Sequence, residues 1–331
     1  MTNSTDFGFI KLDELFKQPL EIDWLIEDII PSNSIGMIYG ASGSGKSHII
    51  LSMATMIANG LQWFGKDTKQ GNVIVLAGEG LRGLHRRLKA IEIEHGLAID
   101  RDKFDISNMA IGLDTKDGRK TVERKIQELK TPPKLIFIDT LSRHLMQSEE
   151  NSNDDMARLI NKLEQMRQKY GCTIILVHHT GKGEKLGARG ASALKANIDF
   201  SFKVAGEDKR CSFSCDKMKD ADDSMPDKRF EIKAVDLGKV DKKGKPITGA
   251  CVVASSAPTI LKVQNKTKEE LALDCFKTDK KEWQKAYVAA CKDAVSEDTK
   301  KRQFRDARKT LIADSKVIKN ADGSFSLVEA A

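Results

Sequence analysis

The chain of 331 residues is poor in proline, cysteine and aromatic residues, with seven prolines, six cysteines and 6% aromatic residues. So few prolines, without a repeated glycine pattern, exclude a collagen-like chain, and 40% hydrophobic residues suffice for a sizeable core. No run of about 18 apolar residues occurs, and the first residues, MTNSTDFGFIKLDELF, contain no basic segment followed by an apolar one. We therefore expect no membrane span, no signal peptide and a cytoplasmic location.

The six cysteines are too dispersed for a disulfide framework in a chain of this length, so we expect reduced thiols. Cys211 and Cys215 stand in the segment CSFSC, and their spacing is compatible with a metal site. No second close pair of cysteine or histidine follows, and the alternating pattern favours a strand. A core strand is therefore the preferred interpretation of this segment.

Apolar strands alternate with helical segments from residue 34 onward. Residues 153–171 start with Asn and Asp and repeat apolar residues at helical spacing, which predicts a helix whose apolar stripe belongs to the core. Alternating strands and helices predict an α/β fold with a parallel sheet flanked by helices. The strands expected in this sheet are 34–39, 72–80, 135–140 and 172–180.

Three parts of the chain are distinguished by pattern. Residues 1–30 are expected to form a strand or clip against the main domain, which spans 31–263. Within that domain the strand-like segments FSFKV, CSFSC and RFEIKAV, joined by charged turns, predict an antiparallel edge of the sheet. Residues 264–331 form the third part.

The third part resembles a winged helix. Helical patterns at 266–278, 281–292 and 298–315 precede a hairpin with an Asp-Gly turn. The third helix carries six basic residues whose spacing suits a phosphate backbone: Lys300, Lys301, Arg302, Arg305, Arg308 and Lys309. A solvated helix face is an equal alternative, because residues 264–331 contain 15 basic against 12 acidic residues, a net charge of only +3.

The strongest motif is GASGSGKS at residues 40–47, which satisfies G-x-x-x-x-G-K-[ST] between a predicted strand and a predicted helix. Its glycines let backbone N–H groups surround a phosphate, and the helix N-terminus adds its positive dipole end. Lys46 bridges the β- and γ-phosphate oxygens, and Ser47 ligates Mg²⁺. We therefore predict a P-loop NTPase that binds ATP and Mg²⁺ through the loop residues Gly40, Ser42, Gly43, Ser44, Gly45, Lys46 and Ser47.

Charged and imidazole side chains follow the other strands at the same sheet edge. Asp139 ends the strand LIFID and is predicted to hold the magnesium shell. Glu79, at the end of the second strand, is the best-placed carboxylate to polarise the attacking water, with capping of the next helix as the alternative. His178 and His179 end the fourth strand, where neighbours point oppositely. Either can contact the γ-phosphate, and His179 is slightly favoured.

Together these pieces resemble the RecA-type fold of hexameric helicases, and most closely the RepA family of plasmid and phage replicative helicases. The resemblance rests on LAGEGLRGLHRRL, LIFIDTLSRH, GCTIILVHHTGKG and GARGASAL, and it covers roughly residues 20 to 240. It implies a ring, usually a hexamer, with ATP bound between subunits and an arginine entering from the neighbour. Arg189 matches that arginine, and the alternatives are a DNA contact or a surface charge.

The same resemblance implies single-stranded DNA in the ring channel, held at its phosphates by loops after the third and fourth strands. Those loops supply Arg143, Lys182 and Lys185. Lys217 and Lys219 match basic residues that related proteins place near the neighbour's nucleotide. The chain lacks a primase or zinc-ribbon sequence, so priming requires another protein, and a primase or a replication initiator is an expected partner.

The preferred interpretation is an ATP-dependent replicative DNA helicase. A recombination or annealing ATPase on the same fold is the first alternative. A helicase would form rings of finite size, whereas a recombination ATPase would form filaments that grow along DNA. A regulatory ATPase whose C-terminal part binds protein is the second. Whether single-stranded DNA changes ATP turnover distinguishes it.

Overall fold

The computed structural model describes residues 10–78, 81–180, 194–207, 209–223, 225–255, 269, 272–273, 275–290, 297–314, 316–320, 322 and 324–328. The chain divides into two compact units, Met1–Ser255 and Ser256–Ala331. The boundary predicted at residue 263 lies outside the described residues.

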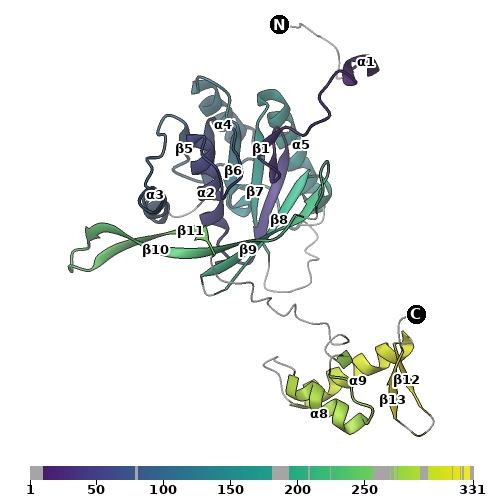
Figure 1. The fold of residues 1–331 in the computed structure, drawn as a ribbon. Helices are drawn as coiled ribbons and strands as arrows, with labels where there is room; N and C mark the ends of the chain where they lie inside the picture. The colour runs from purple at the N-terminus through teal and green to yellow at the C-terminus, as the bar shows by residue number, and fades with distance from the viewer. Residues whose placement is uncertain are drawn as a thin grey trace. The chain divides into compact units, whose positions relative to one another are not determined.

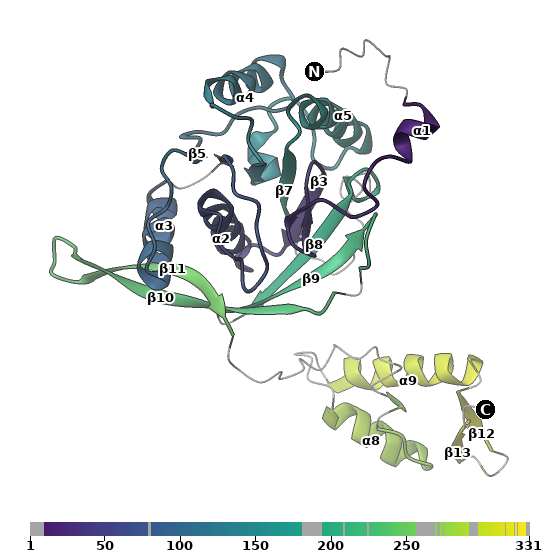
Figure 2. The same cartoon turned by 45° about the horizontal axis from the view of Figure 1, so that its top comes forward.

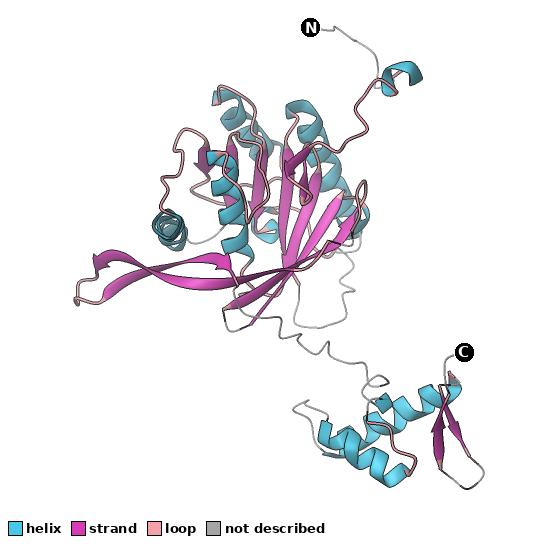
Figure 3. Cartoon of the chain, viewed as in Figure 1, coloured by secondary structure: helices cyan, strands magenta, loops and turns pink. Residues whose placement is uncertain are grey.

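The described residues of the first unit contain a nine-stranded sheet with the order β11-β10-β9-β8-β3-β7-β6-β4-β5. The strands from β8 to β5 in this order are parallel to their neighbours, while β9, β10 and β11 continue the sheet antiparallel (Figures 1 and 3). The α/β fold with its antiparallel edge is therefore confirmed. The strand bounds are β3 Ile35–Gly40, β4 Val73–Ala77, β5 Phe104–Ile106, β6 Leu135–Asp139, β7 Thr173–His179, β8 Phe200–Glu207, β9 Arg210–Met218, β10 Lys228–Val240 and β11 Pro246–Ala254.

Helices cover both faces of the sheet, which is why its central strands are almost continuously apolar (Figure 2). Residues of α2 (Lys46–Asn59) and α3 (Leu81–His95) share one core with Ile38. Residues of α4 (Lys116–Glu128) and α5 (Asn153–Tyr170) share another with Met37 and Tyr39, the strand neighbours of Ile38. No helix among the described residues has the length and hydrophobicity that crossing a bilayer requires.

The predicted helix at 153–171 is present as α5. The Ser152 hydroxyl accepts a hydrogen bond from Asp155 N–H at its start, and Gly171 ends it with a φ of 62°. Its apolar stripe is buried, as predicted, and consists of Met156, Leu159, Ile160, Leu163 and Met166. The sequence patterns did not predict β5, α4 or the short 3-10 helix η1 (Leu141–His144).

The N-terminal segment begins with the short helix α1 (Leu12–Leu15) and reaches the main domain through β1 (Trp24–Ile26) and β2 (Ile30–Pro31), which pair antiparallel. Leu25 and Ile29 are buried in the core that also holds α2. Residues 24–31 therefore complete that core.

The second unit contains α8 (Lys280–Ala290), α9 (Glu297–Ala313), β12 (Val317–Lys319) and β13 (Phe325–Leu327). These elements surround a separate core that includes Trp283, Tyr287 and Phe304. They correspond to the last two predicted helices and the predicted hairpin. Six of the thirteen residues of the first predicted helix, 266–278, lie outside the described residues, so the winged helix stays a prediction.

Trp63 packs against α2, the helix that follows the phosphate loop, and its substitution tests this part of the core. Its side chain is fully buried, its Nε1–H donates to the Ser52 hydroxyl of α2 at 3.2 Å, and its ring meets Phe213 and Phe230 edge-on or tilted. We expect Trp63→Ala to lower the free energy of unfolding of the first unit by about 3–5 kcal/mol, because such a change leaves a large cavity. Trp63→Phe should cost clearly less. Chemical denaturation followed by circular dichroism measures both, and a loss below about 1 kcal/mol for the alanine variant contradicts this packing role.

Candidate functional site

The glycine loop joins β3 to α2 at the carboxyl edge of the parallel strands. Gly43 has a φ of 78° and Gly45, the N-cap residue of α2, a φ of 99°. Both values lie in the left-handed region that favours glycine. No side chain caps the helix start. The first N–H groups of α2 therefore face the loop, as anion binding at a helix N-terminus requires.

The loop lies directly against β8. A Cβ atom on Gly40 would stand 2.0 Å from the Val204 carbonyl oxygen, and one on Gly206 would stand 2.4 Å from the Ser44 carbonyl oxygen. Glycine is therefore required on both sides of this contact. The motif predicts Gly40, but Gly206 carries no motif signal, because its role arises only when β8 packs beside the loop.

Lys46 is the buried cation of the site, with 4% of its surface exposed. Its ammonium donates to the carbonyl oxygens of Gly40 at 2.9 Å and Ala41 at 2.8 Å, and lies 3.1 Å from His179 Nδ1. Burial lowers the pKa of Lys46 to about 8, against the opposing attraction of Asp139. The two loop carbonyls thus fix the Lys46 ammonium group at a desolvated position. Phosphate oxygens can bind this ammonium group there.

Asp139 and Ser47 lie together, as the sequence predicts. Burial raises the pKa of the Asp139 carboxyl group, while a hydrogen bond from the Ser47 hydroxyl and the charges of Arg87 and Lys46 oppose the rise. A carboxylate beside a hydroxyl supplies the oxygen ligands that Mg²⁺ prefers, and Mg²⁺ commonly takes its remaining ligands from water and substrate phosphates. These two residues therefore fit a magnesium ion next to the loop.

A cavity of 340 Å³ opens over these groups. Its walls come from the loop and the start of α2, from the ends of β6 and β7, and from one face of α3. The Ser44 hydroxyl is buried there with no hydrogen-bond partner among the described residues. Predicted residues lining the cavity are Ser42, Gly43, Ser44, Gly45, Lys46, Ser47, Asp139 and His179. Gly40 lies behind it, at the loop base.

The two histidines of β7 have different surroundings. His179 is exposed, pairs in register with Gly40 and reaches the Lys46 ammonium. His178 is buried on the opposite side of the strand, where its Nδ1 lies 2.8 Å from a Glu150 carboxylate oxygen. The structure therefore brings His179 to the cavity and places His178 away from it, which does not favour the predicted nucleotide contact of His178.

Two cavity residues had no role in the sequence prediction. Arg87 lines the cavity one turn after Gly83, on the face of α3 that also presents Leu84. His48 lies there too, and burial together with the nearby Arg87 charge lowers its pKa to about 4. His48 is therefore neutral at pH 7, and Arg87 adds a second cation to Lys46. The signal in the sequence is the segment HRRL, where Arg86 and Arg87 match the RepA-type pattern without indicating a role.

Several predicted residues lie outside the described part of the chain, namely Glu79, Lys182, Lys185 and Arg189. Arg143 is described: it is exposed in η1, directly after β6, and a Cβ atom on Gly78 would stand 2.4 Å from its Cβ. Its DNA contact remains a prediction.

Lys217 and Lys219 have partners within their own chain. The Lys217 ammonium donates to carbonyl oxygens of Lys195 at 2.8 Å and Ile198 at 2.6 Å. Lys219 lies 3.8 Å from Asp199. Lys217 thus ties β9 to the segment that leads into β8. Because its ammonium group is engaged there, the structure does not favour the implied contact with a neighbour's nucleotide.

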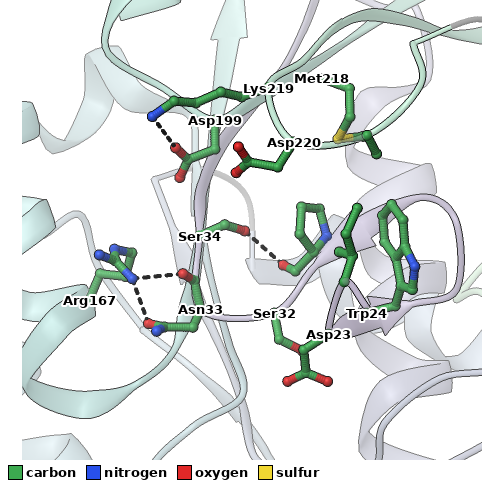
Figure 4. A pocket seen from close by; sticks show the side chains of 13 residues that line it. Asp23, Trp24, Ser32, Asn33, Ser34, Arg167, Asp199, Met218, Lys219 and Asp220 are labelled. Carbon is green, nitrogen blue, oxygen red and sulfur yellow. Dashed lines mark hydrogen bonds and ion pairs between the residues drawn. The ribbon is translucent and has the colours of Figure 1, made fainter. Parts of the chain in front are cut away.

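A second cavity, of 360 Å³, lies at the amino-terminal edge of β3 and β8 (Figure 4). Arg167 donates to the Asn33 carbonyl and side-chain oxygens at 2.7 and 2.8 Å, and the Asp199 carboxylate accepts from Ile35 N–H at 2.9 Å. These charged groups tie the strand starts together. The cavity contains no residue of the glycine loop, so it is separate from the site.

Cys211 and Cys215 both lie in β9, and Cys211 is buried. Among the described residues no group of three or more histidine, cysteine or acidic side chains gathers as a metal site would require. This arrangement fits the preferred interpretation of CSFSC as a core strand.

A mostly parallel sheet with a glycine loop, a buried lysine and a strand-end aspartate at its carboxyl edge defines a P-loop ATPase domain. Comparison with known families agrees. The family model described as AAA domain matches residues 4–185, more than half of the chain. The chain therefore belongs to this AAA-domain family. The narrower resemblance to RepA-type helicases remains a prediction.

The lowered pKa of Lys46 makes nucleotide binding depend on pH. A bound phosphate favours the charged ammonium, so it raises this pKa and draws a proton from solution wherever the free site is partly neutral. Binding of ADP with Mg²⁺ should take up about half a proton at pH 8 and under about a tenth at pH 7. Calorimetry in buffers of different ionisation enthalpy measures this uptake.

Lys46→Arg is the control, because a guanidinium stays charged at both pH values. Its binding should show no proton uptake. Equal uptake by the wild type and the arginine variant would show that Lys46 is not the titrating group.

Proposed function

We propose that the protein is an ATP-dependent DNA helicase that works as a ring of identical subunits, a hexamer by resemblance, with ATP hydrolysed at the subunit interfaces. The contact between His179 and Lys46 is the observation that carries this proposal. It joins the nucleotide cavity to the end of β7, and the chain continues from there into the predicted DNA loop with Lys182 and Lys185. A change at the γ-phosphate can therefore reach DNA through one short segment.

The described cavity residues have defined roles in ATP hydrolysis. Lys46 neutralises charge on the β- and γ-phosphates, and Arg87 adds a second cation from α3. Ser47 and Asp139 would hold Mg²⁺, which would supply charge neutralisation for the phosphates. His179 contacts the γ-phosphate and changes partner when that phosphate leaves.

Outside the described residues, Glu79 polarises the attacking water and Arg189 enters the cavity of the neighbouring subunit. The site of one chain is then incomplete without a second copy. Arg143, Lys182 and Lys185 hold the phosphates of single-stranded DNA in the channel without reading bases. To the second unit, which has its own core, we assign the loading of the ring or the binding of a primase or initiator.

Unwinding of a forked DNA duplex, with the assembly size measured by light scattering on the same sample, tests the proposal. We expect strand separation by a ring-sized oligomer that requires hydrolysable ATP. Asp139→Asn is the matched control, because it keeps the side-chain volume and removes the carboxylate. Its hydrolysis should fall by about 10²-fold, as expected for the loss of several kcal/mol of magnesium stabilisation.

Two outcomes contradict the helicase. DNA-stimulated ATP hydrolysis without strand separation, with assemblies that grow along DNA, favours the recombination or annealing ATPase. ATP hydrolysis that DNA does not change favours the regulatory ATPase.

Mixed assemblies test the shared site. Arg189→Ala should leave nucleotide binding nearly intact and lower hydrolysis about 10³-fold or more, as loss of an arginine finger does. In mixtures of Lys46→Ala and Arg189→Ala subunits, each inactive by itself, an arginine supplied by the neighbour should restore hydrolysis at interfaces that combine the intact Lys46 of one chain with the intact Arg189 of the other. Mixed assemblies of the two variants without any recovered hydrolysis contradict an arginine supplied between subunits.

A further inference from the structure

The hairpin of β10 and β11 projects beyond the sheet (Figures 1 and 2). Strand β9 pairs with β10 only over residues 228–231, and beyond that point β10 pairs with β11 alone. We call residues 236–248 the hairpin arm. At about 3.3 Å per residue, the path from residue 236 to the turn at 241 spans roughly 17 Å. The arm is therefore long enough to reach a ligand that the sheet itself does not touch.

The base of the arm is fixed on α3. A Cβ atom on Gly249 would stand 2.3 Å from the Arg86 carbonyl oxygen, so the backbones of β11 and α3 meet closely. Lys233 forms an ion pair with Glu94 at 2.7 Å, and Val235 is buried in the core. The arm consequently extends from a well-packed base.

The arm carries four exposed lysines, Lys239, Lys242, Lys243 and Lys245. Its two acidic residues are engaged by backbone groups. Asp236 accepts from Gly238 N–H at 2.9 Å. Asp241 accepts from the N–H groups of residues 243 and 245 at 2.7 and 2.9 Å. Within the described part of the chain, none of the four ammonium groups forms an ion pair.

Edge protection does not account for these charges. Lysines on an outer strand prevent edge-to-edge aggregation. Lys242, Lys243 and Lys245, however, lie in the turn between the two strands, where no strand edge is exposed. The turn is ordered by the Asp241 hydrogen bonds and by Gly244 at a φ of 74°. Unpaired ammonium groups held on an ordered projection suit the closely spaced phosphates of a nucleic acid.

We propose that the hairpin arm binds the phosphate backbone of DNA, through lysines other than those predicted in the segments that follow β6 and β7. This inference rests on the proposed action on DNA. The contact is independent of base sequence, because lysine meets a phosphate as a point charge. Helix α3 contacts the base of the arm through Arg86 and lines the nucleotide cavity through Arg87, so one helix joins the two sites.

The test replaces the four arm lysines with alanine in the full chain. Fluorescence anisotropy with labelled single-stranded and duplex oligonucleotides measures DNA affinity across a salt series. We expect affinity to fall at least about 10-fold at 0.1 M salt, and the slope of log affinity against log salt to flatten by about 2 to 4. Replacement by arginine should restore binding.

The matched control replaces Lys116, Lys120, Lys130 and Lys134 with alanine. These lysines are exposed on and near α4, and their removal changes the net charge by the same amount. The control should bind DNA like the wild type. Thermal unfolding verifies that the variants are folded. If the fourfold arm variant is unstable, Lys242→Ala with Lys243→Ala, both in the exposed turn, replaces it.

Loss with both DNA probes, or with one of them, supports the arm as a DNA site and identifies the strand form it binds. Equal DNA affinity of the arm variant and the control overturns the inference. A changed assembly size with unchanged DNA affinity also overturns it, because the arm would then serve contacts between copies of the chain. If the wild type unwinds DNA and the arm variant binds it equally well, the inference alone fails. If the wild type hydrolyses ATP but binds no DNA, the inference and the proposed function fail together.

Discussion

The buried ammonium group of Lys46 is the charge on which the arrangement of the site depends. A cation at this position is disfavoured by desolvation, which lowers its pKa to about 8. It is retained by two loop carbonyls, by the nearby Asp139 and by contact with His179. Glycine at positions 40 and 206 lets the loop that supplies these carbonyls pack against β8. The first unit thus keeps a charge that opposes its own stability and that phosphate binding requires.

The parallel sheet explains why residues distant in sequence meet at this charge. Strands β3, β6 and β7 end at one edge, so the glycine loop, Asp139 and His179 share a cavity although more than 130 positions separate the first from the last. The segments that follow β6 and β7 carry the predicted DNA residues, each within six positions of Asp139 or His179 in the chain. Helix α3 adds Arg87 to the cavity and supports the hairpin arm from its neighbouring residues.

The sequence predicted correctly those features that depend on residue spacing within one helix, strand or loop. The motif at 40–47 predicted strand, loop and helix, and the stripe of α5 predicted its buried face, because each depends on spacing within one element. The alternation of side chains along a strand predicted that one of the two histidines of β7 faces away from the cavity. Which histidine faces the cavity depends on the pairing of His179 with Gly40, and this pairing joins strands that are distant in sequence. The resemblance included Arg87 without a role and gave no signal for Gly206, because their roles appear only once α3 and β8 pack beside the loop. The three-residue strand β5 is too short for a periodic signal.

Release of phosphate from ATP is the measurement that tests the central claim most directly, namely that the cavity around Lys46 hydrolyses ATP with Mg²⁺. Wild-type protein, Lys46→Ala and the surface control Lys120→Ala are compared with and without Mg²⁺. We expect magnesium-dependent release by the wild type and by the control, and a rate at least about 10²-fold lower for Lys46→Ala, as for the loss of one preorganised charge-stabilising group. A Lys46→Ala rate within about twofold of the wild type would contradict the assignment of this cavity.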